Sequence, residues 1–495
     1  MTAQQVDHPS RYDVPDHWSL PDVAAVFRSD DVAAVAGVEE SMSEYFDTAA
    51  RDLSGFGATL LLCTGPSDPG WELTLPNGTE PALHRAPLGS DAAVPEELGQ
   101  LVSGIARGGA LIRFAIVRSE RTTHRWTDET GAVIVEIDET LHTSASTPGA
   151  GQLDTWRELT LEHGPASRPK LARRLGKALI AGGATPATAS IGSRATRVLD
   201  APSSRPRRKA KSGKKNLADA SDAITFLAAQ DATLITEDVR LRTGQEDVHA
   251  VRVATRRARS TLKIFADLFD PTVATRFSGE LGWYAALLGE VRDRQVQRER
   301  FAAALAELPD ELVLGPIAAT IEQHLLSEQL RAAATLREAM AGDRYRELLR
   351  TSSEFVRDPP LAPSTRARVR ARVTSSSVER AGRKAHRRLD RALSAGDDEL
   401  LHEARKAAKR ARYAAELSLG QGGRNRAAVK EFKQLQEILG EYQDSVVASA
   451  LLRQLGAATH ADPTQNGFTF GILHEQEAQR AERARAAAMR WRRRH

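Results

Sequence analysis

The sequence predicts a multidomain α+β protein, in which an N-terminal half with a mostly antiparallel sheet precedes an all-α half. Three observations carry this prediction. Residues 1–200 contain short apolar runs broken by Gly and Pro, and apolar residues follow helical spacing from Leu217 onward. One sequence pattern occurs twice in the second half, first at His249 and again at His402, which predicts two helical bundles related by a pseudo-two-fold axis.

In the N-terminal half, five runs have the composition and partial alternation of strands, and two have helical spacing. The expected strands are 57–63, 71–76, 111–119, 132–139 and 156–162, and the expected helices are 21–27 and 167–184. The second helix ends at a pair of glycines, Gly182 and Gly183, which is typical of a helix C-terminus.

A basic segment, 201–216, joins the two halves. It holds seven Lys and Arg, with Pro, Ser and Gly and no aliphatic residue larger than Ala, and this composition predicts a flexible linker. The linker is either a solvated tether or an added attraction for a polyanion. The helical domain is expected over 217–490, with breaks at 244–247, 269–272, 308–312, 357–364, 394–399, 420–425 and 460–467.

The repeat has two parts in each copy. Residues 249–260 match 402–413 at an offset of 153, and "LGEVRD" at 288–293 matches "LGEYQD" at 439–444 at an offset of 151. Asp293 and Asp444 end these second motifs, and we expect them to cap or buttress helices rather than to do chemistry. Two matches in the same order indicate a duplicated unit.

Each copy places a row of cations along one face of its helix. At about 100° per residue, His249, Arg252, Arg256, Arg259 and Lys263 fall within an arc of about 80°, and His402, Arg405, Lys409 and Arg412 repeat the same angles. Like charges three or four residues apart cost a helix about 0.2–0.5 kcal/mol per pair. Because no Asp or Glu occupies these positions, an external anion is the simplest compensation. The alternative is a solvated basic face that pairs with acids elsewhere in the bundle.

Arg and Lys are suited to phosphate oxygens, and a nearby His adds charge as pH falls toward about 6.5. Apart from Tyr413 at an edge, the two rows contain no aromatic residue, whereas single-stranded nucleic acid is usually bound with interleaved aromatic side chains. A linear phosphate chain without bases therefore fits better than nucleic acid.

The two copies resemble the halves of a CHAD domain over about residues 217–490. The resemblance implies an all-helical domain whose basic central surface binds inorganic polyphosphate. The residues that it implies as contacts are His249, Arg252, Arg256, Arg259, Lys263, His402, Arg405, Lys409 and Arg412, with Lys430 and Lys433 as further basic residues of the second half. The first-half equivalent of Lys433 is Gly282, which leaves open whether the halves contribute equally.

Residues 1–200 resemble a CYTH domain in "RYDVPDHWSLPDV", "GWELTLP", "GAVIVEIDE" and "WRELTLE". That resemblance implies an antiparallel β-barrel tunnel, whose active members hold triphosphate with Arg and Lys and bind Mg²⁺ or Mn²⁺ through acidic residues. The sequence departs from the family pattern. The opening E-x-E-x-K motif becomes Asp7, Pro9 and Arg11, and Thr74 and Thr160 stand where Lys and an acid are expected.

The polar residues that remain are Arg85, Arg118, Arg121, Glu136, Asp138, Glu158, Glu162 and Arg194. Glu136 and Asp138 share one strand face, as do Glu158 and Glu162, so these four are the candidate metal ligands, although the same pattern suits outward polar positions. We expect weakened or absent triphosphatase activity.

Bulk composition bounds the remaining expectations. The chain has 495 residues, 41% hydrophobic and 27% charged, which is typical of globular proteins. We expect no membrane span and no signal peptide. The single cysteine, Cys63, excludes an internal disulfide and fits a reducing cytoplasm, and the Ala- and Arg-rich usage suggests a bacterial source.

The charge is divided unevenly. Residues 1–200 carry 17 Lys and Arg against 27 Asp and Glu, whereas residues 201–495 carry 52 against 38. The basic half is the candidate for a polyanion partner. The leading hypothesis is a cytoplasmic, granule-associated polyphosphate-binding protein with an inactive tunnel. The alternatives are a metal-dependent triphosphate or polyphosphate hydrolase and a nucleic-acid-associated protein. The oligomeric state is open.

Overall fold

The computed structural model divides the chain into two compact units, 1–208 and 209–495. The boundary falls within 201–216, the expected linker, which lies outside the described residues together with the expected motif positions Asp7 and Pro9. The structure describes residues 10–21, 23, 26, 33–66, 69–77, 81–89, 93–128, 130–146, 153–167, 169–187, 194, 217–245, 247–362, 373–417, 423–458 and 467–494.

The described strands of the N-terminal unit form one nine-stranded antiparallel sheet in the order β5-β4-β3-β2-β6-β7-β8-β1-β9. The strands are β1 (Ser10–Val14), β2 (Ala33–Asp47), β3 (Thr59–Thr64), β4 (Gly70–Leu75), β5 (Ala82–Pro87), β6 (Ile112–Thr127), β7 (Val133–Ser146), β8 (Leu153–His163) and β9 (Thr185–Pro186). All five strands expected from the sequence are present. The longest strand that the sequence did not predict is β2, which mixes Gly, Ser and Glu with its apolar residues.

The sheet is curled, as shown by the contact of residues from distant strands on its inner face. Tyr45 of β2 packs in one cluster with Trp156 of β8, although β6 and β7 lie between their strands. The outer face of β1, β7 and β8 is covered by helix α4 (Pro169–Ala181), whose Leu175 and Leu179 pack on Leu159 and Leu161. Helices α2 (Asp52–Phe56) and α3 (Glu96–Ala106) complete the described helices of this unit. Most of the expected helix 21–27 lies outside the described residues.

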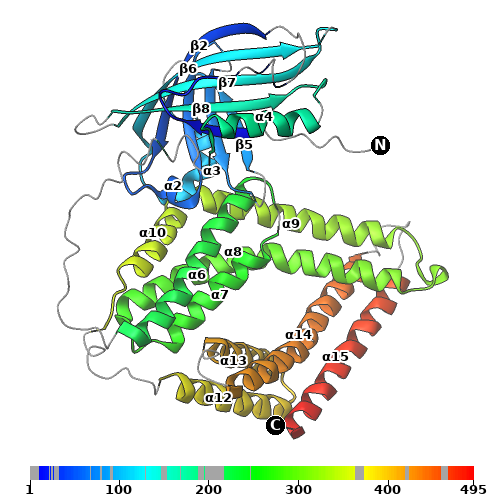
Figure 1. Cartoon of the computed structure of the whole chain (residues 1–495). Helices are drawn as coiled ribbons and strands as arrows, with labels where there is room; N and C mark the ends of the chain where they lie inside the picture. The colour runs from blue at the N-terminus through cyan, green and yellow to red at the C-terminus, as the bar shows by residue number, and fades with distance from the viewer. Residues whose placement is uncertain are drawn as a thin grey trace. The chain divides into compact units, whose positions relative to one another are not determined.

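The described part of the second unit is helical, as expected. Its helices are α6 (Leu217–Arg242), α7 (His249–Ile264), α8 (Pro271–Ala306), η1 (Asp310–Leu312), α9 (Ile317–Ala341), α10 (Asp343–Arg357), α12 (Val373–Ala395), α13 (Asp398–Leu417), α14 (Gly423–Ala458) and α15 (Phe468–Arg494). Figure 1 shows α14 and α15 running side by side, and α8 and α9 also pack against each other. None of the described helices is long and apolar enough to cross a membrane.

The duplication inferred from the repeat appears in the helix lengths. The motif helices α7 and α13 are each followed by a helix of 36 residues, α8 and α14. Helix α10 interrupts the equivalence. It begins directly after Gly342, where the sequence analysis expected a continuous helix. A single glycine between two helical patterns was too weak a signal to reveal that break.

Local capping fixes where the helices begin. The Asp270 carboxylate accepts hydrogen bonds from the backbone N–H groups of Thr272 and Val273 at 2.9 and 3.1 Å, and Pro271 follows it at the first helical position of α8. Asp397 accepts from the N–H groups of Glu399 and Leu400 at the start of α13. These caps fix the first residues of α8 and of the motif helix α13.

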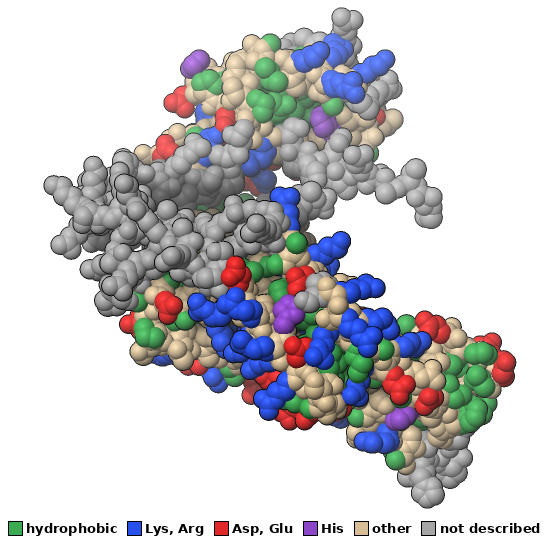
Figure 2. All heavy atoms as spheres, turned by 90° about the horizontal axis from the view of Figure 1, so that it is seen from below, with side chains coloured by type: hydrophobic (Ala, Val, Ile, Leu, Met, Phe, Trp, Pro, Cys, Tyr) green, Lys and Arg blue, Asp and Glu red, His purple; other side chains and the backbone are tan. Residues whose placement is uncertain are grey.

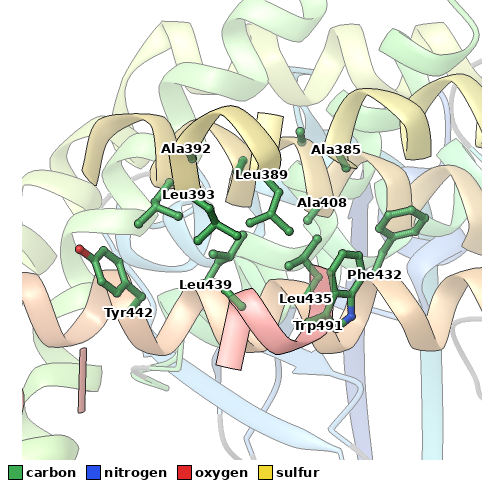
Figure 3. Packing of buried hydrophobic residues seen from close by; sticks show 14 of the residues in the cluster. Ala385, Leu389, Ala392, Leu393, Ala408, Phe432, Leu435, Leu439, Tyr442 and Trp491 are labelled. Atoms are coloured by element: carbon green, nitrogen blue, oxygen red, sulfur yellow. The ribbon is translucent and has the colours of Figure 1, made fainter. Parts of the chain in front are cut away.

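Several apolar cores among the described residues hold the helical unit together, and two of them bear on the site. In the second half, Leu389 of α12, Leu435 and Leu439 of α14, and Trp491 of α15 enclose the alanine face of α13 (Figure 3). A second core joins the halves, because Phe301 of α8 and Ile321 of α9 pack with α14 and α15. Arg300 adds polar links across this junction, donating to Glu477 of α15, and to Glu441 and Ser445 of α14 at 2.8 and 2.7 Å. The packing therefore fixes the two motif helices relative to each other.

Candidate anion-binding site

The cation rows of α7 and α13 lie against each other. The charges of Arg252, Arg256 and Arg405 all act on Lys409, and those of Arg252, Arg405 and Arg412 act on Arg256. We call these five residues the central cluster: Arg252, Arg256, Arg405, Lys409 and Arg412. They come from both copies of the repeat, so the duplication brings two like-charged rows to one place.

The central cluster is electrostatically strained. Burial, and then the charges of Arg405, Arg256 and Arg252, lower the pKa of Lys409 to about 7. Burial also lowers the pKa of Arg256, whose Nε is buried without a hydrogen-bond partner. Neither side chain forms an ion pair with a carboxylate of the described residues. An anion that entered between them would relieve this repulsion.

Carboxylates compensate other members of the cluster in part. Arg252 Nη1 lies 3.0 Å from Asp293 Oδ1, and Arg405 Nη1 lies 3.5 Å from Asp444 Oδ1, so each aspartate pairs with the arginine of the motif helix in its own copy. Arg412 Nε lies 3.1 Å from Glu416. Figure 2 shows many Lys and Arg side chains on one face, with Asp and Glu interspersed among them. The compensation is incomplete, because Arg256 and Lys409 form no ion pair within the described residues, although the charge of Asp444 also acts on Lys409.

The glycine of each "LGE" motif makes room for an arginine. A Cβ atom on Gly440 would lie 3.3 Å from an Arg405 guanidinium nitrogen, and one on Gly289 would lie 3.8 Å from Arg252. The guanidinium groups therefore rest on the backbones of α14 and α8, where the aspartate of the same motif reaches them. This explains why the two motifs of each copy occur together.

The aromatic and histidine side chains near the cluster do not resemble a base-stacking surface. Tyr413 is only 5% exposed, and its ring lies 4.8 Å from the Arg412 guanidinium carbon. Burial, with the charges of Lys406 and Arg405, lowers the pKa of His402, so this side chain is neutral at pH 7. The added charge expected from His402 near pH 6.5 therefore requires more acidic conditions.

The other residues implied by the resemblance lie outside the central cluster. His249 is exposed at the first residue of α7, and the Arg259 guanidinium rests against Gly282 of α8. Lys430 and Lys433 are exposed on α14, where Lys433 lies 3.7 Å from Glu437. Lys263, at the last turn of α7, belongs to a different group of charges.

Lys263 lines a pocket of about 190 Å³ between α7, α12 and α13, which we call the α12 pocket. The sequence analysis did not single out three of its cations, Arg380 and Lys384 of α12 and Arg410 of α13. A signal was available, because residues 380, 384 and 388 are all basic and recur every fourth position. This row has no counterpart in the first half, because α6 carries no such row of cations.

In the N-terminal unit, the inner face of the curled sheet carries the predicted acids together with basic partners. The Arg11 guanidinium pairs with Glu158, which is only 3% exposed, and Arg125 Nε lies 2.6 Å from Glu136. Arg121 lies 2.5 Å from Glu39 and 3.6 Å from Asp138. Each of these arginines is thus matched by a carboxylate on a neighbouring strand.

The remaining polar residues of this unit follow the same rule. Arg85 pairs with Glu72 at 2.8 Å, Arg118 with Glu40 at 2.7 Å, and Arg194 with Asp13. Arg118 and Glu40 lie on the outer face, because strand side chains alternate. Part of the inner face is apolar, where Tyr45, Ala115, Val117 and Trp156 are buried together. His142 stacks on Trp156, and burial, with the charges of Arg11 and Arg194, lowers its pKa to about 4. The inner face is therefore neither open nor a bare cationic wall.

The four candidate metal ligands are not arranged as a metal site. Glu136 and Glu158 pair with arginines, Asp138 accepts from Thr123 Oγ1 at 2.5 Å, and Glu162 is exposed. The described residues contain no group of three or more His, Cys, Asp or Glu placed to hold a metal. A divalent ion of this kind needs six or more oxygen ligands, several of them supplied by protein or substrate. The four acids therefore do not fit a site for such a divalent ion.

Comparison with known proteins finds a family model that matches the helical unit and relatives that match nearly the whole chain. The model of the CHAD domain family matches residues 225–453. Uncharacterized protein Rv2226 of Mycobacterium tuberculosis H37Rv is 34% identical over 486 residues, covering 92% of this chain and 90% of that protein, and its counterpart MT2285 in strain CDC 1551 matches equally.

Solved structures resemble parts of the chain. PptA from Streptomyces chartreusis has a TM-score of 0.46 at 21% identity, and the match covers 55% of this chain and 98% of PptA. The CHAD domain from the plant Ricinus communis has a TM-score of 0.40 at 24% identity, with 55% and 91% covered. A putative adenylate cyclase from Bacillus halodurans has a TM-score of 0.26 at 11% identity, with 38% and 96% covered. The chain belongs to the same protein family as Rv2226, and its helical unit contains a CHAD domain.

Proposed function

We propose that the helical unit binds inorganic polyphosphate on the central cluster. The observation that carries this proposal is the pair Arg256 and Lys409, which come from equivalent positions of the two repeats and form no ion pair with a carboxylate of the described residues. A flexible phosphate chain supplies one negative charge per unit and needs no base recognition. The buried Tyr413 argues against nucleic acid as the preferred ligand, because single-stranded binding relies on exposed aromatic rings.

We further propose that the N-terminal unit is a degenerate tunnel that does not hydrolyse triphosphate or polyphosphate. A triphosphate entering the inner face would have to separate Arg11, Arg121 and Arg125 from the carboxylates that hold them. Incubation of the full chain with tripolyphosphate and Mg²⁺ or Mn²⁺ is expected to release no phosphate above a protein-free control. Turnover that disappears in Glu158→Gln would overturn this part of the proposal.

The binding proposal is tested by titrating the full chain with long-chain polyphosphate and with duplex DNA of equal charge at several salt concentrations. We expect tighter binding of polyphosphate, with an affinity that falls by about 0.7 log unit per log unit of salt for each phosphate contacted, by analogy with single strands. The variant Arg252→Ala/Arg256→Ala/Arg405→Ala/Lys409→Ala is expected to lose at least about 100-fold in affinity, because each lost charge-assisted contact is worth about 1.5–3 kcal/mol.

A matched control removes four exposed arginines that lie away from the cluster: Arg276, Arg331, Arg337 and Arg350. This control has the same net charge as the cluster variant, so it separates local contacts from overall attraction. Equal losses in the two variants, or DNA bound as tightly as polyphosphate, would contradict the proposal. Circular dichroism verifies that both variants retain their helices.

A further inference from the structure

The two sides of the α7–α13 crossing are not equivalent, although the repeat makes them so in sequence. Arg257 and Arg410 occupy the same repeat position, as do Lys263 and Glu416. On one side, Arg257 Nη2 lies 3.7 Å from Glu416. On the other side, Arg410 and Lys263 line one pocket, and the charge of Arg410 is the main reason why the pKa of Lys263 is lowered. One exchange of charge therefore turns an ion pair into a repulsion.

A second difference opens space on the repulsive side. Ser260 lines the α12 pocket, whereas its repeat equivalent is Tyr413, whose bulky side chain is buried. The pocket volume of about 190 Å³ exceeds that of the ~150 Å³ engineered cavity that admits benzene. The pseudo-symmetric position is thus filled and neutralised, while this one is hollow and basic.

The pocket concentrates positive charge, which the nearby Glu403 compensates only in part through its charge on Arg410. Its lining includes four cations, Lys263, Arg380, Lys384 and Arg410, and none of the four forms an ion pair with a carboxylate of the described residues. The charges of Arg259 and Arg388 add to the field at Lys263. The pocket lining also includes the apolar residues Ile264, Ala381 and Ala407, whose side chains cannot accept a hydrogen bond.

The pocket also continues the surface proposed for polyphosphate. Arg256, Arg259 and Lys263 follow one another along the same face of α7, so a chain lying on the central cluster is led toward the pocket. An internal phosphate of such a chain carries one charge. A terminal phosphate carries about 1.5 to 2 charges at pH 7, because its second pKa is about 6, as in a phosphomonoester. A pocket lined by four cations that form no ion pair within the described residues thus suits the most highly charged group of the ligand.

We propose that the α12 pocket binds the terminal phosphate of a polyphosphate chain, so that the chain lies on the helical unit in one direction with its end in the pocket. This inference rests on the proposed function for the inner part of the chain. The same dianionic group is offered by short condensed phosphates such as tripolyphosphate, and the experiment separates the two sources.

The test uses the full chain and three probes at one salt concentration: tripolyphosphate, long-chain polyphosphate, and the same long chain with both terminal phosphates blocked by a covalently attached amine. Lys263→Glu places a carboxylate beside Arg410, as Glu416 does beside Arg257. It is expected to weaken tripolyphosphate binding at least tenfold and long-chain binding only a few-fold. Blocking the ends is expected to weaken binding to the wild-type protein and to leave binding to Lys263→Glu unchanged.

The control is Arg337→Glu, an equal change of charge at an exposed position of α9, and Lys384→Gln serves as a second pocket variant. Equal tripolyphosphate affinities in Lys263→Glu and Arg337→Glu would overturn the inference. So would a wild-type protein that does not distinguish blocked from unblocked long chains. Failure of the proposed function gives a different result, in which long-chain polyphosphate binds no better than duplex DNA whatever residue stands at position 263.

Discussion

The two units of this protein differ in whether their cationic side chains have carboxylate partners. On the inner face of the sheet, Arg11, Arg121 and Arg125 each have a carboxylate on a neighbouring strand. At the α7–α13 crossing, Arg256 and Lys409 form no ion pair within the described residues, and the charges that act on them are mainly those of other cations. A cation with an internal partner stabilises its unit and is not available to a ligand, whereas a cation without one costs stability until an anion arrives. The pairing of individual residues, more than the net charge of a unit, separates a structural arginine from a binding arginine.

The largest expected effect comes from removing one arginine of each kind. Arg11→Met leaves the buried Glu158 without its main partner, and loss of one member of a buried pair costs about 3–5 kcal/mol. Arg256→Met instead removes a half-buried charge that repels its neighbours, so it is expected to be neutral or stabilising. Chemical unfolding of the full chain, followed separately by sheet and helix signals, measures both changes.

A further substitution sharpens this result. Adding Glu158→Gln to Arg11→Met removes the stranded charge and is expected to recover part of the lost stability. The comparison between the units would be wrong if Arg256→Met destabilised its unit as much as Arg11→Met destabilises the sheet.

An intermediate effect is expected from pH. The pKa of Lys409 is about 7 in the free protein, and a bound polyanion stabilises its charged form, so binding takes up a proton above pH 7. Polyphosphate affinity is therefore expected to fall as pH rises from about 7 to 9, by at most about 1.4 kcal/mol per pH unit. Calorimetric titration at several pH values measures this slope.

Lys409→Arg provides the matched control for the pH effect, because arginine keeps its charge throughout this range. This variant is expected to bind with little change in affinity between pH 7 and 9. An equally steep slope in the variant would assign the pH dependence to another group.

The smallest effect distinguishes the two halves of the helical unit. In Gly440→Ala, the new methyl group meets the Arg405 guanidinium at 3.3 Å and displaces it, so polyphosphate affinity should fall a few-fold. In Gly289→Ala the contact with Arg252 is an ordinary 3.8 Å, and affinity should stay unchanged. Both variants gain up to about 1 kcal/mol of helix propensity. Thermal unfolding and titration of the two variants side by side test this, and equal affinities would contradict the close-approach argument.

Sequence reasoning succeeded where a residue pattern is local or repeated. The five expected strands and the helix over Pro169–Ala181 follow from apolar periodicity, and the break before Pro271 follows from its Asp-Pro signal. The long strand β2 was missed, because Gly37 and the polar residues between 39 and 44 interrupt its apolar pattern. The break at Gly342 was missed because one glycine carries little weight between two strong helical segments.

For the candidate site, the sequence alone determined which side chains share a face of α7 or α13, because helical geometry fixes their angles within one segment. It also determined the duplication, and with it the equivalence of Arg256 and Lys409. Only the tertiary structure decided which charges meet across segments. The pairing of Arg252 with Asp293, the burial that lowers the pKa of Lys409, and the placement of Lys384 beside Lys263 all depend on how separate helices pack. Coulombic and desolvation energies depend on distance and burial in three dimensions, and spacing along the chain does not encode them.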